Sequence, residues 1–370
     1  MPDRESDGWL SQGPALAALG FDEVWNDLFA AFERRGLLPG RIAGVDRAAL
    51  DVLCADGPVR ATVGGPVLQA IATDPSAGPC SGDWAALRSW PDARTTVEAL
   101  LPRRTAVTRA QSSGVSRGQV LAANVDVVLV AVSLQVDPSL PRIERLLTLA
   151  WDSGATPVLV LTKADLAPDA DFVAQDLRAL APGVDVVVAS AVTGEGLDLL
   201  SGIASPRRTL ALIGQSGVGK STLVNSLAGS SVATVAAIGA GGRGRHTTVR
   251  RDLVQLPSGA LLIDTPGLRG VGLVDAGHGA QGLAWAFPDI EELSLACRFA
   301  DCAHSSEPGC AVVAAVADLT LPERRLHSWR KLVAQSQWMA QRSDARARSE
   351  QRRQWAAISK SLRRHGLNRP

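Results

Sequence analysis

The sequence predicts a multidomain chain: an N-terminal OB-type β-barrel, a central doubly wound α/β domain and a C-terminal α-helical domain with closely spaced cysteines. Short strand-like segments separated by Gly, Pro and Asp turns occupy residues 39–112, as in small antiparallel barrels. Residues 113–288 contain nearly continuous apolar segments, the composition of strands buried on both faces of a parallel sheet. Three cysteines and a histidine lie close together within residues 289–340.

Composition excludes several classes of protein. Of the 370 residues, 46% are apolar and 20% are charged, which suits several packed cores and argues against disorder throughout. No apolar run reaches the roughly 18 residues of a membrane span, and the polar start MPDRESDGWL does not resemble a signal peptide. We therefore expect a cytoplasmic protein with no membrane partner, and we expect a monomer.

Positive charge is concentrated at the C-terminus. Residues 321–370 contain 13 Lys and Arg against 3 Asp and Glu, whereas the other 320 residues contain 25 against 34. A basic tail on an acidic body suits a polyanionic partner. A solvated helix with arginines on its wet face has the same composition, so the pattern alone does not decide.

Residues 1–38 form a predicted helical extension before the barrel. The segment FDEVWNDLFAAFERRG has apolar residues at helical spacing and ends at Gly36. The segments RIAGV, ALDVLCA, VRATV and TVEALLPR are predicted strands of a five-stranded barrel over residues 39–112. Barrels of this type commonly bind oligonucleotides.

The α/β domain, residues 113–288, contains five predicted parallel strands. They are VDVVLVAVSL, PVLVLTKADL, DVVVASA, TLALIG and ALLIDTPG, with amphipathic segments such as PRIERLLTLAWDSG between several of them. Polar residues gather where the strands end, at the edge where such sheets bind ligands. A cysteine-containing domain is expected over residues 289–340, and a basic helical or disordered tail over 341–370.

The segment GQSGVGKS, residues 214–221, fits the phosphate-binding pattern G-x-x-x-x-G-K-[ST] between a strand and a helix. Its glycines let backbone N–H groups turn toward phosphate oxygens at a helix N-terminus. Lys220 is predicted to reach the β- and γ-phosphates, and Ser221 to ligate Mg²⁺. The predicted nucleotide-binding residues of this segment are Gly214, Gln215, Ser216, Gly217, Val218, Gly219, Lys220, Ser221 and Thr222.

Two further segments complete a predicted triphosphate site. In LLIDTPG, Asp264 lies at a strand end, where its carboxylate can bind Mg²⁺ through a water molecule. The backbone N–H of Gly267 follows, where it can contact the γ-phosphate. The glycine-rich segment GRGRHTT carries Thr247 and Thr248. Either threonine can complete the Mg²⁺ shell when the triphosphate orders this loop as a switch.

Two strand ends resemble the base-reading elements of GTPases. In LTKADL, Asp165 would accept from the N1–H and 2-amino group of guanine, and the Lys163 stem would cover the ring. ASAVTGEG resembles the S-A element, here Ser190 and Ala191, whose backbone N–H contacts guanine O6. Thr162 stands where the N-K-x-D pattern has asparagine, and this departure leaves room for looser base selectivity.

The segment CRFADCAHSSEPGC has the spacing C-x4-C-x-H-x5-C. Cys297, Cys302, His304 and Cys310 suit one closed tetrahedral Zn²⁺ site, and four protein ligands leave no open position for catalysis. We therefore expect one structural zinc ion. The alternative is a set of buried free thiols near a surface histidine.

The order of these motifs differs from that of ordinary GTPases, which begin with the P-loop. Here both base-reading elements precede residues 214–221. A sheet whose termini are adjacent can be opened at a different loop without moving its site. The order therefore predicts a circularly permuted P-loop GTPase domain.

Taken together, TKAD, SA, GQSGVGKST, GRGRHTT, DTPG and CRFADCAHSSEPGC resemble the bacterial ribosome small-subunit-dependent GTPase family (RsgA), from about residue 40 to about residue 340. The resemblance implies an OB-fold domain, a permuted GTPase domain and a zinc domain. It also implies hydrolysis of GTP to GDP and phosphate, stimulated by the small ribosomal subunit (30S) and its rRNA during late subunit maturation. The family's motif residues fall on Lys163, Asp165, Lys220, Ser221, Thr248, Asp264 and the four zinc ligands.

GTP hydrolysis needs an in-line water, Mg²⁺ and neutralisation of charge at the γ-phosphate. Leu268 occupies a position where many GTPases have a polar residue, which predicts slow intrinsic turnover that a partner raises. Within this chain, His246 is the candidate to orient the attacking water, and the predicted catalytic residues are His246, Lys220 and Thr248. A role for His246 in stabilising the loop or in contacting rRNA is an equal alternative. The remaining alternatives are a nucleotide-regulated RNA-binding scaffold with negligible turnover and, because of Thr162, an ATP-using enzyme.

Overall fold

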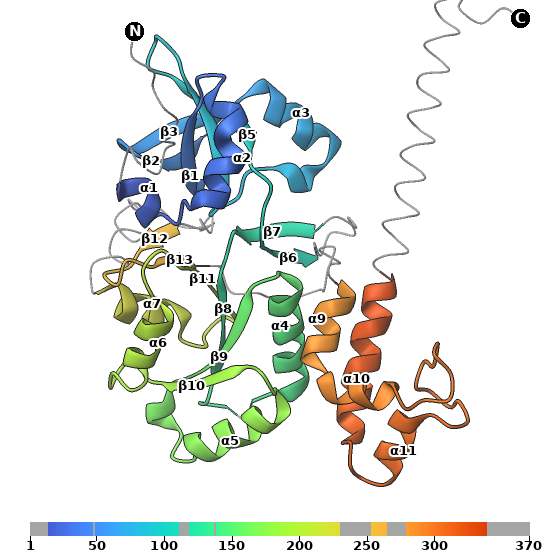
Figure 1. Cartoon of the computed structure of the whole chain (residues 1–370). Coiled ribbons are helices and arrows are strands. Elements are labelled where there is room, and N and C mark those ends of the chain that lie inside the picture. The colour runs from blue at the N-terminus through green and yellow to red at the C-terminus, as the bar shows by residue number, and fades with distance from the viewer. Residues whose placement is uncertain are drawn as a thin grey trace, which may run out of the picture.

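The computed structural model describes residues 14–46, 49–110, 118–136, 138–229, 253–264 and 279–338. These residues form a closed barrel, a six-stranded sheet flanked by helices, and a helical C-terminal part that packs beside helix α4 (Figure 1). Among them, no helix combines the length and the apolar character needed to cross a membrane.

The barrel closes in the strand order β1–β2–β3–β5–β4. Its strands are β1 (Leu38–Val45), β2 (Leu50–Cys54), β3 (Gly57–Val63), β4 (Trp84–Ser89) and β5 (Thr95–Leu100), with α3 (Gly65–Thr73) and the 3₁₀ helix η1 (Pro75–Ala77) between β3 and β4. The predicted OB-type barrel is thus confirmed. Strand β4 was missing from the predicted segments, because its sequence WAALRS lacks the β-branched residues that mark a strand.

Helices α1 (Pro14–Ala18) and α2 (Glu23–Glu33) precede the barrel and pack against it. Trp25 and Phe29 of α2 are buried, and the Phe21 ring lies edge-on to Trp84 of β4 with centroids 4.9 Å apart. Asp22 caps α2 by accepting from the N–H of Trp25 at 3.0 Å. Trp25 and Phe29 therefore pack toward the barrel as the helical pattern predicts, whereas Val24 and Leu28 of the same pattern are exposed.

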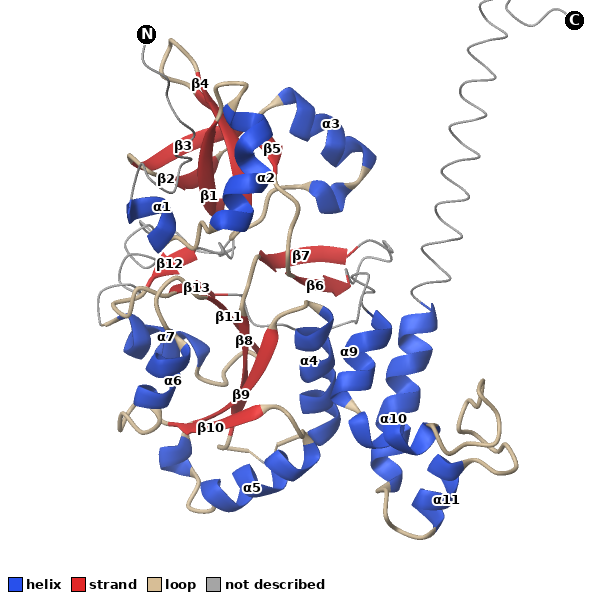
Figure 2. Cartoon of the chain, in the orientation of Figure 1, coloured by secondary structure: helices blue, strands red, loops and turns tan. Residues whose placement is uncertain are grey.

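The sheet has the strand order β10–β9–β8–β11–β13–β12. Its strands are β8 (Val127–Ser133), β9 (Thr156–Thr162), β10 (Asp185–Ala189), β11 (Thr209–Gly214), β12 (Leu253–Gln255) and β13 (Leu261–Asp264). All neighbours are parallel except β12 and β13. Helices α4 (Leu140–Asp152) and α5 (Ala170–Leu180) share a core with one face, and α6 (Leu197–Ile203) and α7 (Lys220–Ala228) share a core with the other (Figure 2). Burial on both faces explains the continuous apolar segments.

Strand register brings the functional strand ends to one edge of the sheet. Thr162 at the end of β9 pairs with Ser133 of β8 and with Ala189 of β10. Gly214 at the end of β11 pairs with Ala131 of β8. Parallel strands put all these carboxyl ends on the same side, which is where a doubly wound sheet binds its ligand.

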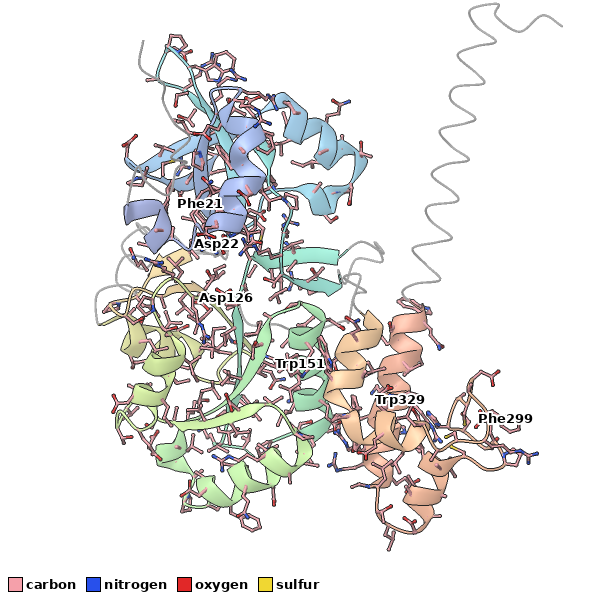
Figure 3. All side chains as sticks on the ribbon, viewed as in Figure 1. Phe21, Asp22, Asp126, Trp151, Phe299 and Trp329 are labelled. Atoms are coloured by element: carbon pink, nitrogen blue, oxygen red, sulfur yellow. The ribbon has the colours of Figure 1, made fainter. Side chains whose placement is uncertain are left out.

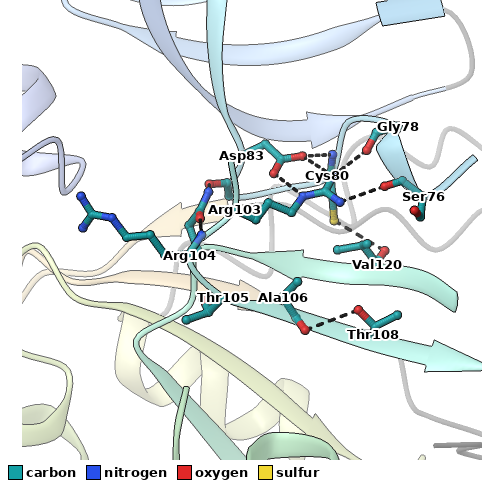
Figure 4. A network of polar contacts seen from close by, with 12 residues as sticks. Ser76, Gly78, Cys80, Asp83, Arg103, Arg104, Thr105, Ala106, Thr108 and Val120 are labelled. Carbon is teal, nitrogen blue, oxygen red and sulfur yellow. Dashed lines mark hydrogen bonds and ion pairs between the residues drawn. The ribbon is translucent and has the colours of Figure 1, made fainter. Parts of the chain in front are cut away.

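The β-hairpin β6 (Ala106–Ala110) and β7 (Gly118–Ala123) lies between barrel and sheet (Figure 1). Arg103, just before this hairpin, pairs with Asp83 of the barrel at 2.7 and 2.8 Å and donates to the carbonyls of Ser76 and Gly78 (Figure 4). Because the Asp83 side chain is fully buried, this pair fixes the path of the chain from the barrel toward the sheet.

Arg41 of β1 connects the barrel to the sheet more directly. Its guanidinium donates to the carbonyls of Leu19, Gly82 and Asn124, and to Oγ1 of Thr209 at the start of β11. Burial lowers the pKa of Arg41 to about 10, and nearby carboxylates oppose that shift. Phe21, Asp22 and Asp126 mark this junction in Figure 3, beside a cavity of about 550 Å³.

The C-terminal part contains α9 (Gly279–Ala286), α10 (Pro288–Ser294), α11 (Ala311–Ala317) and helical residues 323–338. Helix α9 packs closely on α4: a Cβ atom at Gly282 would lie 1.9 Å from Oδ1 of Asp152. The rings of Trp151 and Trp285 lie 5.2 Å apart at the same contact. This part of the chain is therefore docked on the helix that follows β8.

Candidate nucleotide and metal sites

The P-loop runs from the buried end of β11 to the start of α7, as its sequence predicts. Gly214, Gly217 and Gly219 have φ values of 151°, 85° and 96°, in the region that favours glycine. At Gly214 a Cβ atom would also lie 2.5 Å from the carbonyl oxygen of Ala131. The backbone can follow this path only with glycine at these positions.

Lys220 is 7% exposed and folds back across the loop. Its Nζ donates to the carbonyl of Gly214 at 3.0 Å and to that of Gln215 at 2.6 Å. Burial lowers the pKa of Lys220 and raises that of Asp264, and the attraction between the two charges opposes both shifts. The cation and the strand-end carboxylate therefore lie near each other, as a site for phosphate and Mg²⁺ requires.

The rest of the cradle is open to solvent. Ser216, Gly217, Ser221 and Thr222 are exposed, whereas Val218 is buried. The Gln215 side chain accepts from Arg142 of α4 at 3.0 Å.

The two predicted base-reading segments meet. Ser190 is fully buried and its hydroxyl donates to Oδ1 of Asp165. The Ser190 hydroxyl oxygen accepts from the N–H groups of Val192 and Thr193 at 3.2 Å. These bonds hold the Asp165 carboxylate beside the loop that follows β10.

Thr162 joins the base-reading strand to the P-loop. Its Oγ1 lies within hydrogen-bond distance of the carbonyl of Val218 in the P-loop and 3.1 Å from that of Val132 in β8. A hydroxyl has one hydrogen to donate, so these carbonyls share or alternate in accepting it. Sequence reasoning missed this contact; the signal was a small hydroxyl residue in place of asparagine at a buried strand end.

Lys163 completes the connection between the two halves of the site. Its backbone has a φ of 61°, and its Nζ donates to Oε1 of Gln135 at 2.8 Å. Its stem lies against Gly219, since a Cβ atom there would be 3.7 Å from Cε of Lys163. The base-reading and phosphate-binding elements thus lie at one edge of the sheet, in direct contact.

Several predicted residues lie outside the described part of the chain. They are Gly267 and Leu268, and His246, Thr247 and Thr248. Asp264, at the end of β13, is half-buried, and it and Ser221 are the described candidates for holding Mg²⁺.

The cysteine segment forms a compact cluster. One ligand atom from each of Cys297, Cys302, His304 and Cys310 lies within 4.8 Å of all the others. Nδ1 of His304 is 3.6 Å from Sγ of Cys297 and 3.5 Å from Sγ of Cys310, and those sulfurs are 3.9 Å apart. In a tetrahedral site with zinc bonds of about 2.3 Å to sulfur and about 2.0 Å to nitrogen, two sulfurs lie about 3.8 Å apart and a sulfur lies about 3.5 Å from a nitrogen. The side chains therefore fit zinc.

Neighbouring groups hold these ligands in place. Cys310 caps helix α11, its Sγ accepting from the N–H of Val313. The Glu307 carboxylate accepts from the N–H groups of Ala303, Ser305 and Ser306, which shapes the loop between ligands. The His304 ring packs against Trp329, with centroids 5.2 Å apart.

Comparison with known proteins agrees with this geometry. Residues 100–274 match the model of the RsgA GTPase family. A small ribosomal subunit biogenesis GTPase RsgA from Streptomyces coelicolor is 51% identical over 351 residues, covering 93% of each chain. The chain belongs to this GTPase family. The RsgA of Opitutus terrae is 40% identical over 358 residues, covering 94% of this chain and 97% of the relative.

Solved structures support the fold. YjeQ from Thermotoga maritima has a TM-score of 0.59 at 24% identity, covering 80% of this chain and 97% of its own. YloQ, described as a circularly permuted GTPase, has a TM-score of 0.55 and covers 84% of this chain and 96% of its own. The predicted permuted fold and the predicted GTP hydrolysis are confirmed, and membership of a GTPase family implies GTP, GDP and Mg²⁺.

Proposed function

We propose that this GTPase acts on the small ribosomal subunit during its late maturation, and that the subunit and its rRNA stimulate hydrolysis. The relatives from Streptomyces coelicolor and Opitutus terrae are named small ribosomal subunit biogenesis GTPases. The structural observation that carries the nucleotide part of this proposal is the contact of Thr162 and Lys163 with the P-loop.

Each residue of the site has a proposed role. Asp165 accepts from guanine, with Lys163 covering the ring and Ser190 and Ala191 bordering the base. Lys220 exchanges its two loop carbonyls for phosphate oxygens, which are better acceptors for an ammonium group. Ser221 and Asp264 hold Mg²⁺, and Gly267 and Thr247 or Thr248 contact the γ-phosphate and the ion. His246 orients the attacking water.

The domain boundaries that we propose are those predicted from the sequence. We propose a helical extension (1–38), an OB-fold domain (39–112), a permuted GTPase domain (113–288), a zinc domain (289–340) and a basic tail (341–370). One structural Zn²⁺ ion is held by Cys297, Cys302, His304 and Cys310. The protein works as a cytoplasmic monomer.

The test is GTP hydrolysis with and without purified small subunits. We expect slow turnover alone and a marked rise with subunits, and Lys220→Ala should abolish both. An absence of stimulation would refute the proposed partner and favour a scaffold that only binds nucleotide. Competition of GTP and ATP for labelled GDP decides the base: equal competition would refute the role of Asp165.

A further inference from the structure

A groove on the barrel lies between helix α3 and strand β5, which run side by side in Figure 2. Its volume is about 490 Å³, within the range of about 300–1,000 Å³ that ligand pockets occupy. The apolar residues that line it from the helix and the strand are Pro66, Val67, Ala70, Ala99 and Leu100. Ala99 and Leu100 are half-buried, so a partner that binds here removes further apolar surface from water.

Strand β5 borders the groove with an edge that β3 does not cover. Its pairing with β3 ends at Val97, because the chain leaves β3 after Val63 and turns into α3. On the other side of β5, the N–H of Leu101 donates to the carbonyl of Trp84. Antiparallel neighbours alternate between bonded and non-bonded pairs, so the N–H and C=O of Leu100 point away from β4 and toward α3. An extended peptide beside β5 can pair with these groups, as in β-strand addition.

A carboxylate lies near each end of the groove. Glu98 adjoins the start of α3, since a Cβ atom at Gly64 would be 2.9 Å from its Oε1. Asp74 follows the last residue of the helix and accepts from the N–H of Ser76 at 3.0 Å. At about 1.5 Å per residue, the helix separates Gly64 from Asp74 by about 15 Å. An ionised carboxylate has about four acceptor sites, so each of these groups can also bind a cation from a partner.

The one cation that lines the groove, Arg103, is already neutralised. It pairs with Asp83, whose side chain is fully buried, and donates to two backbone carbonyls (Figure 4). The charge that remains on the lining is therefore negative and comes from Asp74 and Glu98. Acidic ends repel the phosphates of a nucleic acid and favour a basic partner.

We propose that the groove between α3 and β5 binds an extended basic segment of a second protein. The segment adds a strand beside Leu100, packs an apolar side chain on Ala70, and places basic side chains four residues apart at Glu98 and Asp74. An extended chain rises about 3.3 Å per residue, so four residues span about 13 Å, and both basic side chains lie on the same face. The long stems of lysine or arginine cover the remaining distance. This inference does not depend on the proposed ribosomal partner.

The test measures binding of the fluorescein-labelled peptide GKTVTKG to the full chain by anisotropy, with GETVTEG as the control peptide. GKTVTKG should bind saturably and GETVTEG should not. Glu98→Gln and Asp74→Asn should each weaken binding about threefold to fivefold, the effect of losing one exposed ion pair. Because the two carboxylates lie far apart, the double variant should lose about tenfold to 25-fold. Asp176→Asn, the same charge change at an exposed position of α5, is the matched control and should change nothing.

The shape of the groove is tested within α3. Ala70→Phe fills the groove and should abolish binding of GKTVTKG. Ala72→Phe, at an exposed position of the same helix that does not line the groove, should bind the peptide as wild type does. Both variants should melt like wild type and hydrolyse GTP at its intrinsic rate, because the groove is separate from the nucleotide site.

Unchanged peptide binding in folded Ala70→Phe, or in the double variant of Glu98 and Asp74, overturns the inference. Other occupants would overturn it in different ways. A peptide of residues 341–356 that displaces the probe at a lower concentration than unlabelled GKTVTKG would assign the groove to this chain's own basic tail. A sedimentation coefficient that changes in Ala70→Phe and not in Ala72→Phe would assign it to a second copy. A loss of single-stranded RNA binding confined to Ala70→Phe would assign it to nucleic acid.

Discussion

Arg325 holds the C-terminal part of the chain on helix α4, and its replacement by Met should release that part. The side chain is 2% exposed. It donates to Glu144 of α4 at 3.0 Å, to Asp289 of α10 at 2.7 Å and to the carbonyl of Ala286 at 3.1 Å. Removal of one partner from a buried ion pair costs about 3–5 kcal/mol, because the other charge stays buried.

The neighbouring Arg324 offers a matched control. It reaches the same oxygen of Glu144 at 3.3 Å, but its side chain is 37% exposed. An exposed ion pair contributes at most about 1 kcal/mol, so Arg324→Met should have a small effect. The two variants remove the same charge from the same helix and differ in burial.

Hydrogen exchange measured by mass spectrometry gives the local opening free energy of the C-terminal helices. Arg325→Met should speed exchange in α10, α11 and residues 323–338 by more than about 100-fold, and Arg324→Met by less than about fivefold. Peptides from the barrel should be unchanged in both. Equal effects of the two variants, or less than fivefold for Arg325→Met, would refute the argument from burial.

Three further predictions concern the nucleotide site, the metal and pH. Thr162→Val should weaken GTP binding about tenfold, because the buried Val218 carbonyl loses its hydrogen-bond donor. Thr162→Ser keeps the hydroxyl and should bind GTP normally. Equal GTP affinities of the two variants in nucleotide titrations would count against the contact. The purified chain should contain one zinc ion. Cys302→Ser should lose the ion and melt at a lower temperature, whereas the control Cys54→Ser should keep it. Retention of zinc by Cys302→Ser would exclude Cys302 as a ligand. The hydrogen bond from Arg104 holds the pKa of Asp22 below its usual range. The stabilisation by this carboxylate is therefore full at neutral pH and is lost as the pH falls through the folded pKa. Wild type should accordingly exceed Asp22→Asn in urea-unfolding stability at neutral pH, and the difference should shrink as the pH falls through the acid range. A difference that stays constant with pH would contradict the assignment.

The sequence predicted the features that depend on local pattern. The glycines and Lys220 of the P-loop, the parallel strands and the cysteine cluster follow from residue types at short spacing, and the structure has them where expected. Strand β4 was missed, because WAALRS has no β-branched residue and two alanines, which are depleted in strands.

Long-range contacts could not be read from the sequence. Arg41 looks like an ordinary surface arginine until the fold places Thr209, 168 positions away, against it. Glycine is needed at position 282 only because α4 lies so close that a Cβ atom there would collide with Asp152. The role of Thr162 likewise depends on the P-loop lying across the end of β9. Such contacts arise from topology, which local periodicity does not encode.

We propose that Asp165 and Lys220 contact the same nucleotide, Asp165 at the base and Lys220 at the phosphates. The most direct measurement is the affinity of Asp165→Asn for GTP and for XTP, whose base carries a carbonyl in place of the 2-amino group. The amide can donate to that carbonyl, so the account predicts a fall in GTP affinity of at least about 100-fold, as expected when a paired polar group is lost, and a gain for XTP. Lys220→Ala should weaken both nucleotides alike. Unchanged preference for GTP in Asp165→Asn would show that this carboxylate does not read the base.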